Sequence, residues 1–286
     1  MQNCLKMKLY KYQGAGNDFL IADNRDGSIE LDPRQIADIC DRRYGVGADG
    51  LMLLENSPEY DFRMVYYNSD GSGGMMCGNG VRCVGKYVYD NLLEDKSRDT
   101  ITIETLSGIK TLKITAVNGK AELLEVDMGK AILNAADIPV VYDGCDTVIA
   151  KPLVVDNKEH IVTCVSMGNP HCIVFVEDTK NFPLEEVGPL FESHEVFPNR
   201  VNAEFVQILD RKTVNMRVWE RGSGETLACG TGTCATVVAS CLNGHTEDEV
   251  TVHLLGGDLF IKWDREENLV YMTGPAKVVF DGEIEL

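Results

Sequence analysis

Short runs of alternating hydrophobic and polar residues cover most of the chain, and such runs predict β-strands. In the first half these runs lie at 7–12, 18–23, 50–55, 62–68 and 100–105. In the second half they lie at 147–155, 160–166, 172–177, 203–209 and 214–220. Asn118-Gly119 and Gly256-Gly257 are typical of tight hairpin turns between strands. The pattern therefore predicts a protein rich in β-structure.

Helices are fewer, and three segments carry apolar residues at helical spacing. Asp32-Pro33 opens one of them, as an N-cap followed by a proline at the first helical position. A second begins near Gly78, and a third begins near Gly230 and ends at Asn243-Gly244, a good stop signal. The second and third helices each follow a cysteine and a glycine-rich turn.

The two halves share one register. Asn17 and Asn169 lie 152 positions apart, and the same offset relates Asn68 to Glu220, Cys77 to Cys229 and Gly78 to Gly230. Coincidence among glycine-rich turns is one explanation. We favour the other, in which the chain contains two copies of one structural unit, because a repeat of this length indicates two pseudo-symmetric domains and not a solenoid.

The chain has ten cysteines but no C-x-x-C pair, so zinc-ribbon and thioredoxin-type sites have little support. Most of these cysteines are expected to be small buried fillers. Cys77 and Cys229 differ, because each directly precedes a predicted helix. The N–H groups at a helix N-terminus stabilise a thiolate, which lowers the pKa of the cysteine. They also bind carboxylates.

Two such cysteines, one from each repeat, suit the inversion of a carbon centre. If the two elements faced one bound substrate, a sulfur would lie on each side of its α-carbon. One sulfur would remove the hydrogen as thiolate while the other supplied a proton as thiol. No lysine motif for pyridoxal phosphate is evident, so we expect no cofactor.

Other interpretations of the glycine-rich turns fit less well. A phosphate-binding loop would need a lysine after Gly80 or Gly232, and none follows at the required place. A dinucleotide fingerprint lacks its third glycine, and the cysteine spacings do not suit a common zinc site, so we predict no metal.

The charge balance restricts the partners. With 27 basic and 45 acidic residues the net charge is -18, which argues against nucleic acid or anionic membranes as partners. The N-terminal residues lack the apolar core of a signal peptide, and no stretch approaches the roughly 18–20 apolar residues of a membrane span. We therefore expect a cytoplasmic protein that acts on a small molecule.

Five ordered blocks resemble the diaminopimelate epimerase family: GAGNDF (14–19), NSDGSGGMMCGNGVRC (68–83), GNPHC (168–172), VNAEFV (201–206) and ERGSGETLACGTGTCA (220–235). The resemblance implies an α+β fold of two pseudo-symmetric domains, each a mixed β-sheet or barrel curled around a central helix. The active site would lie in the cleft between them. The domains would span 1–126 and 127–274, with a C-terminal strand at 275–286 returning to the first.

The resemblance also implies the chemistry. It points to epimerisation of L,L- and meso-2,6-diaminopimelate in lysine biosynthesis, without a cofactor, by a protein that forms a homodimer. The implied catalytic residues are Cys77, Cys229, His171 and Glu220. The implied substrate-binding residues are Asn17, Asn68, Gly78, Asn79, Asn169, Asn202, Glu220, Arg221, Gly230 and Thr231.

These residue types suit a diamino dicarboxylic acid. Arg221 can bind a carboxylate with two parallel hydrogen bonds, and Glu220 can pair with an ammonium group. Two alternatives stay open, namely that Glu220-Arg221 is an exposed strand-end pair and that His171 is a structural histidine. The chain departs from the family at Gly50, where some members carry a substrate-binding glutamine, and at Met75-Met76, where an acidic residue commonly precedes the methionine.

Three competing functions remain at this point. A racemase or isomerase acting on proline, hydroxyproline or a phenazine precursor would use the same kind of fold, but the two cysteines and the set of asparagines disfavour it. A redox protein would use Cys77 and Cys229 as a disulfide. A non-catalytic amino-acid-binding protein would need neither thiol.

Overall fold

The computed structural model describes residues 6–285 and divides the chain into two compact units. The first unit ends at Val126 and resumes at Gly274. The second unit runs from Asp127 to Thr273. Within residues 6–285, none of the helices has the length and hydropathy needed to cross a bilayer.

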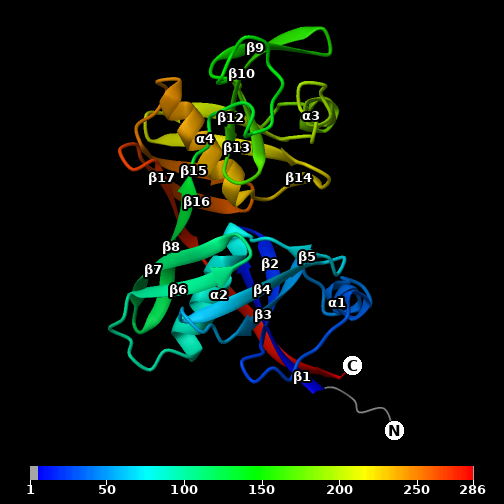
Figure 1. The fold of residues 1–286 in the computed structure, drawn as a ribbon, viewed down its shortest axis with the longest axis vertical. Coiled ribbons are helices and arrows are strands. Elements are labelled where there is room, and N and C mark those ends of the chain that lie inside the picture. Colours follow the sequence, from blue (N-terminus) through cyan, green and yellow to red (C-terminus); the bar gives the residue numbers. More distant parts are fainter. Residues whose placement is uncertain (1–5, 286) are drawn as a thin grey trace. The chain divides into compact units, whose positions relative to one another are not determined.

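Each unit consists of one mixed sheet with two helices (Figure 1). The first unit contains β1 (Lys6–Gly14), β2 (Asn17–Asp23), α1 (Pro33–Cys40), β3 (Gly50–Glu55), β4 (Phe62–Asn68), β5 (Gly73–Gly74), α2 (Gly78–Asn91), β6 (Thr100–Thr105), β7 (Gly108–Val117), most of β8 (Lys120–Lys130) and β18 (Lys277–Glu285). The second unit contains β9 (Lys151–Val155), β10 (Lys158–Ser166), β11 (Pro170–Phe175), α3 (Leu184–Glu192), β12 (Asn202–Asp210), β13 (Thr213–Glu220), β14 (Gly224–Thr226), α4 (Gly230–Leu242), β15 (Glu249–Leu254), β16 (Gly257–Asp264) and β17 (Leu269–Pro275).

The two sheets have the same topology. In the first unit the strand order is β18-β1-β2-β3-β4-β6-β7-β8, and in the second it is β9-β10-β11-β12-β13-β15-β16-β17. The parallel neighbours are β2/β3 and β4/β6 in one unit and β11/β12 and β13/β15 in the other. The remaining pairs named in these orders are antiparallel. This agreement confirms the predicted α+β fold with two pseudo-symmetric repeats.

One helix in each unit is enclosed by its own sheet. The residues of α2 are buried from Gly78 to Tyr89, and those of α4 are buried from Gly232 to Cys241. In Figure 1, α2 and α4 each run alongside the strands of their own unit. Because a helix buried on every side needs partners all around it, each sheet must curl around its helix. For α4 these partners are β10, β11, β12, β15 and β16.

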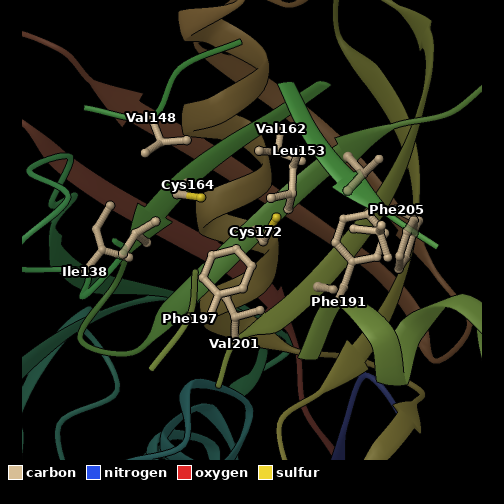
Figure 2. Packing of buried hydrophobic residues seen from close by; sticks show 14 of the residues in the cluster. Ile138, Val148, Leu153, Val162, Cys164, Cys172, Phe191, Phe197, Val201 and Phe205 are labelled. Atoms are coloured by element: carbon tan, nitrogen blue, oxygen red, sulfur yellow. The ribbon is translucent and has the colours of Figure 1, made fainter. Parts of the chain in front are cut away.

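The hydrophobic core of the second unit contains two of the cysteines expected to be buried fillers, Cys164 and Cys172. Figure 2 shows Cys164 and Cys172 among aliphatic and aromatic side chains, and the two residues are cross-strand partners on β10 and β11. Phe191 of α3 packs edge-on against Phe205 of β12, with ring centroids 5.4 Å apart. The first unit has its own core, which includes Leu20, Ile36 and Leu51.

The local signals in the sequence are largely confirmed. Asp32 caps α1 by accepting a hydrogen bond from the Gln35 N–H, and Asn118-Gly119 turns between β7 and β8. The strand predicted at 147–155 is shorter than expected, because β9 begins only at Lys151. The preceding residue, Ala150, has a φ of +50°, which interrupts an extended backbone.

Candidate active site

Cys77 and Cys229 occupy the same position in the two repeats, directly before α2 and α4. Each is the N-cap residue of its helix, with φ and ψ of -126° and 119° at Cys77 and -118° and 109° at Cys229. The Cys77 carbonyl accepts from the Val81 N–H, and the Cys229 carbonyl accepts from the Thr233 N–H, both at 2.8 Å. The prediction that both cysteines lie at helix N-termini is therefore confirmed.

The electrostatic setting of Cys229 differs from the expected one. Its side chain is buried, and burial followed by the charges of Glu220 and Glu204 raises the pKa of the Cys229 thiol well above its usual value. The Thr231 hydroxyl, 3.6 Å from the sulfur, and the Gly232 N–H act in the opposite direction but are outweighed. The expected lowering of this pKa is therefore wrong for Cys229, which is held as a thiol.

A chain of polar side chains runs beside the start of α2 in the first unit. Asn17 donates to Asp49 Oδ2 at 3.1 Å, and its own oxygen accepts from Asn79 Nδ2 at 2.6 Å. Arg82 Nη1 donates to the oxygen of Asn79 at 3.0 Å. Two predicted substrate-binding residues, Asn17 and Asn79, are therefore in direct contact, and Asn79 lies two residues after Cys77.

Asn68 ends β4, in the turn that leads to Cys77. Its Nδ2 donates to Ser72 Oγ at 3.0 Å, and its backbone N–H donates to the Ser72 carbonyl at 2.9 Å. Gly71 in this turn has a φ of +82°, which favours glycine. The turn fixes the Asn68 amide at the end of the strand.

Tyr66 occupies the space beside Gly50, where some family members carry a glutamine. A Cβ atom built on Gly50 would overlap the Tyr67 carbonyl oxygen and lie 2.6 Å from the Tyr66 ring. The same ring passes over Gly74 and packs edge-on against Phe19, with centroids 6.2 Å apart. No side chain fits at position 50 unless both the Tyr66 ring and the backbone carbonyl of Tyr67 move.

In the second unit, the GNPHC block and β12 come together around a buried histidine. His171 Nδ1 lies 2.7 Å from Glu204 Oε1, and its Nε2 lies 3.0 Å from Asn169 Oδ1. One ring nitrogen of His171, one oxygen of Glu204 and the sulfur of Cys229 all lie within 4.8 Å of one another. His171 and Asn169 are therefore in contact with each other, and His171 lies close to Cys229.

Asn202 connects three of the sequence blocks. It lies beside His171 in the parallel pairing of β11 with β12. Its Nδ2 donates to the Pro170 carbonyl at 2.9 Å, and its oxygen accepts from the Arg221 N–H at 3.0 Å. Both ends of this buried amide are therefore used to hold the backbone around the site.

Glu220 and Arg221 lie where β13 ends, and their surroundings differ. Glu220 is half-buried and accepts a short hydrogen bond from the Thr226 hydroxyl. Arg221 is exposed, and its Nη1 donates to the Asn199 carbonyl at 3.0 Å. The charge of Glu220 raises the pKa of the Cys229 thiol. Most of the Arg221 guanidinium remains available to a ligand.

Sequence reasoning missed three acidic residues that hold this arrangement together. Glu204 binds His171, Asp49 binds Asn17, and Glu192 accepts from the Gly222 N–H at 2.9 Å in the turn after Arg221. A signal for Glu204 was present, because a glutamate inside the apolar run of VNAEFV needs a buried partner. No comparable signal marks Asp49 or Glu192.

Solved structures with this arrangement of strands and helices define the class of fold. A phenazine biosynthesis protein of the PhzF family from Bacillus anthracis matches with a TM-score of 0.69 at 19% identity, covering 98% of this chain and 99% of that one. A hydroxyproline epimerase from Agrobacterium vitis matches with a TM-score of 0.71 at 13% identity, covering 100% of this chain and 93% of that one. At these identities the likeness establishes the shared fold alone.

Sequence relatives place the chain more narrowly. The diaminopimelate epimerase from Acetivibrio thermocellus is 51% identical over 281 residues, covering 98% of this chain and 99% of that protein. The diaminopimelate epimerase from Methanococcus maripaludis (strain C5) is 52% identical over 281 residues, covering 98% and 100%. The family profile described as diaminopimelate epimerase matches residues 9–134 and 163–279. The chain belongs to the diaminopimelate epimerase family.

Proposed function

We propose that this protein interconverts L,L- and meso-2,6-diaminopimelate, with Cys77 and Cys229 as the acid–base pair and without a cofactor. The observation that carries the proposal is the occurrence of these cysteines as N-caps of equivalent helices in two repeats of one topology. The names of relatives about half identical over nearly the whole chain support the choice of substrate.

The two proton transfers use one sulfur as thiolate and the other as thiol. In one direction, the Cys77 thiolate removes the α-hydrogen as a proton, and the Cys229 thiol gives its proton to the opposite face of the resulting carbanion. In the reverse direction the two sulfurs exchange roles. The raised pKa of Cys229 favours its thiol form in the free protein, which suits it as the proton donor in the first direction.

We assign substrate binding to the residues that surround these cysteines within each unit. Arg221 supplies a guanidinium for a carboxylate, and Glu220 supplies a carboxylate for an ammonium group. The N–H groups of the first turns of α2 and α4 supply donors for a carboxylate, and these turns contain Gly78, Asn79, Gly230 and Thr231. The two compact units act as epimerase-like domains, with β18 in the first.

Replacement of each cysteine tests the proposal. Cys77→Ala and Cys229→Ala should each lower the rate of epimerisation by about 10² or more, because each removes one acid–base partner. Cys145→Ala is the matched control, since Cys145 is half-buried in a loop and lies outside the site. The rate is measured by separating the stereoisomers of diaminopimelate over time. Normal turnover in either active-site variant would refute the assignment.

We also propose that the protein works as a homodimer in the cytoplasm, within lysine biosynthesis. The support for the dimer is β18, which ends the sheet order of the first unit and exposes Val278, Val279 and Phe280. Exposed apolar side chains on an edge strand favour pairing with another chain. Light scattering should give the mass of two chains for the wild type and of one chain for Phe280→Asp. A monomeric wild type would contradict the dimer.

A further inference from the structure

Glu204 is a buried carboxylate that the proposed reaction does not use. It lies on β12 with 0% of its surface exposed, and its Oε1 is 2.7 Å from His171 Nδ1. Its other oxygen, Oε2, has no hydrogen-bond partner among residues 6–285. A buried carboxylate with one oxygen that accepts from no donor among these residues is costly in its ionised form, because the hydration lost on burial is not replaced by the protein.

The hydrogen bonds of His171 limit where the protons lie. Its Nε2 faces Asn169 Oδ1 at 3.0 Å, and an amide oxygen only accepts, so Nε2 carries a hydrogen. Its Nδ1 faces Glu204 Oε1 at 2.7 Å, and two lone pairs do not approach so closely without a proton between them. Glu204 and His171 therefore hold one proton between them, either as imidazole with carboxylic acid or as imidazolium with carboxylate.

The burial of Glu204 favours retention of this proton. Burial raises the pKa of Glu204 and outweighs His171, which lowers it, and the charge of Glu220 adds a smaller rise. The Cys229 thiol at the start of α4 lies close to the same carboxylate. Loss of the shared proton would leave a negative charge near a second carboxylate, Glu220, and the buried Cys229 sulfur.

Asn169 is hydrogen-bonded to the His171 ring on the side opposite Glu204. Its oxygen accepts from His171, so its two Nδ2 hydrogens face elsewhere, and no hydrogen bond of that NH₂ group is found among residues 6–285. An amide in the reverse orientation would present its oxygen to the substrate and would repel a carboxylate. The protonation of His171 therefore decides which end of the Asn169 amide is available.

We propose that Glu204 is a positioning residue, which shares one proton with His171 and thereby orients Asn169 to donate its Nδ2 hydrogens to a carboxylate of the substrate. The proposal rests on the proposed function, because it assumes that Asn169 contacts the amino-acid substrate. Glu204 itself acts through His171 and does not touch the substrate.

The Asn169 amide should lose this orientation as the pH rises. When the pair loses one proton, the imidazole keeps a single hydrogen, which moves to Nδ1 and is donated to the Glu204 carboxylate, so Nε2 faces Asn169 Oδ1 without a hydrogen. The amide must then turn, and its oxygen faces the substrate. Substrate binding should weaken above the pH at which the pair loses its proton, so KM should rise with pH.

Two substitutions of Glu204 by residues of similar size distinguish its effect on the Asn169 amide from the effect of its charge. Glu204→Gln has an NH₂ group that can donate to His171 Nδ1 and has no carboxyl group that can lose a proton, so we expect it to keep Nε2–H and the orientation of Asn169 as the pH rises. Glu204→Met fills the same space but cannot donate. We expect Glu204→Gln to keep KM for meso-diaminopimelate within about threefold and to lose the rise in KM at high pH. Glu204→Met should raise KM about tenfold or more, because no group then holds the His171 hydrogen on Nε2 and the Asn169 amide is free to turn.

The ¹⁵N shifts of the His171 ring test the same claim without any need for turnover. The His171 signals are identified by their loss in His171→Gln. The expected result is a protonated Nε2 in the wild type and in Glu204→Gln at neutral pH. A wild-type ring with Nδ1–H and a bare Nε2 would overturn the proposal, as would a Glu204→Met variant with unchanged KM. If the protein failed to epimerise diaminopimelate, the ring shifts would still decide the protonation of the pair.

Discussion

A methyl group at Gly232 should disturb the second unit far more than the same group at Gly80 disturbs the first. The two glycines are equivalent, each being the third residue of its central helix. A Cβ on Gly232 would overlap Glu204 Oε1 and lie 3.2 Å from the Cys229 sulfur. A Cβ on Gly80 would overlap the terminal methyl of Met52 and lie 3.2 Å from its sulfur. The neighbours differ in freedom, because a methionine end rotates easily whereas Glu204 is bound to His171.

The expected magnitudes follow from these neighbours. Replacing glycine by alanine in a helix gains about 1 kcal/mol at both positions. Overpacking costs about 1–3 kcal/mol, with the lower end expected beside the flexible Met52. At Gly232, displacement of Glu204 also weakens its buried hydrogen bond to His171, which costs about 1.5–3 kcal/mol. Gly80→Ala should therefore change the free energy of unfolding by less than about 1 kcal/mol, and Gly232→Ala should lower it by about 1.5–5 kcal/mol.

Urea unfolding followed by circular dichroism measures this difference. Gly73→Ala is the control for the substitution itself, because a Cβ at Gly73 would meet no atom within 4 Å. A chain of two units need not unfold in one step. The variants are therefore compared by the urea concentration at the unfolding midpoint, and only where the slopes of their unfolding transitions are equal. If Gly232→Ala were as stable as Gly80→Ala and Gly73→Ala, the buried Glu204 could not be fixed as the structure describes.

Three further results are expected. Asn202→Ala should lower the free energy of unfolding by about 1–3 kcal/mol in the same urea assay, because two backbone groups lose their hydrogen bonds to the amide. Glu220→Gln removes a charge that raises the pKa of Cys229, so the midpoint of Cys229 alkylation, followed by mass spectrometry of its peptide, should move to lower pH. An unmoved midpoint would exclude Glu220 from the field at that thiol. Gly50→Ala should destabilise the protein by about 1–3 kcal/mol in thermal unfolding, because its Cβ would overlap the carbonyl oxygen of Tyr67.

Local patterns in the sequence predicted much of the fold. Asn68, which ends β4, and Gly78, which begins α2, have equivalents 152 positions later. These are Glu220, which ends β13, and Gly230, which begins α4. Strand alternation and glycine-rich turns are properties of neighbouring residues, so they can be read from the chain alone. The strand at 147–155 was overestimated because a single left-handed residue, Ala150, leaves no clear mark in the sequence.

The electrostatics of the site could not be predicted in the same way. A helix N-terminus is a local feature and suggested a lowered pKa for Cys229. Burial and the carboxylates of Glu204 and Glu220, which come from two other strands, reverse the direction. The space beside Gly50 is likewise filled by Tyr66 of another strand. Effects that depend on residues distant in the sequence become visible only in the folded chain.

The central claim is that two different groups act on the two faces of one carbon. The most direct test follows the first turnovers of L,L-diaminopimelate in deuterated water, with mass spectrometry of the separated product and the recovered substrate. A pair of thiols predicts deuterium at the α-carbon of the meso product before any appears in the recovered L,L substrate, since the returning hydrogen comes from the second sulfur. Equal early labelling of both, as a single base would give, or no deuterium in either, would contradict it.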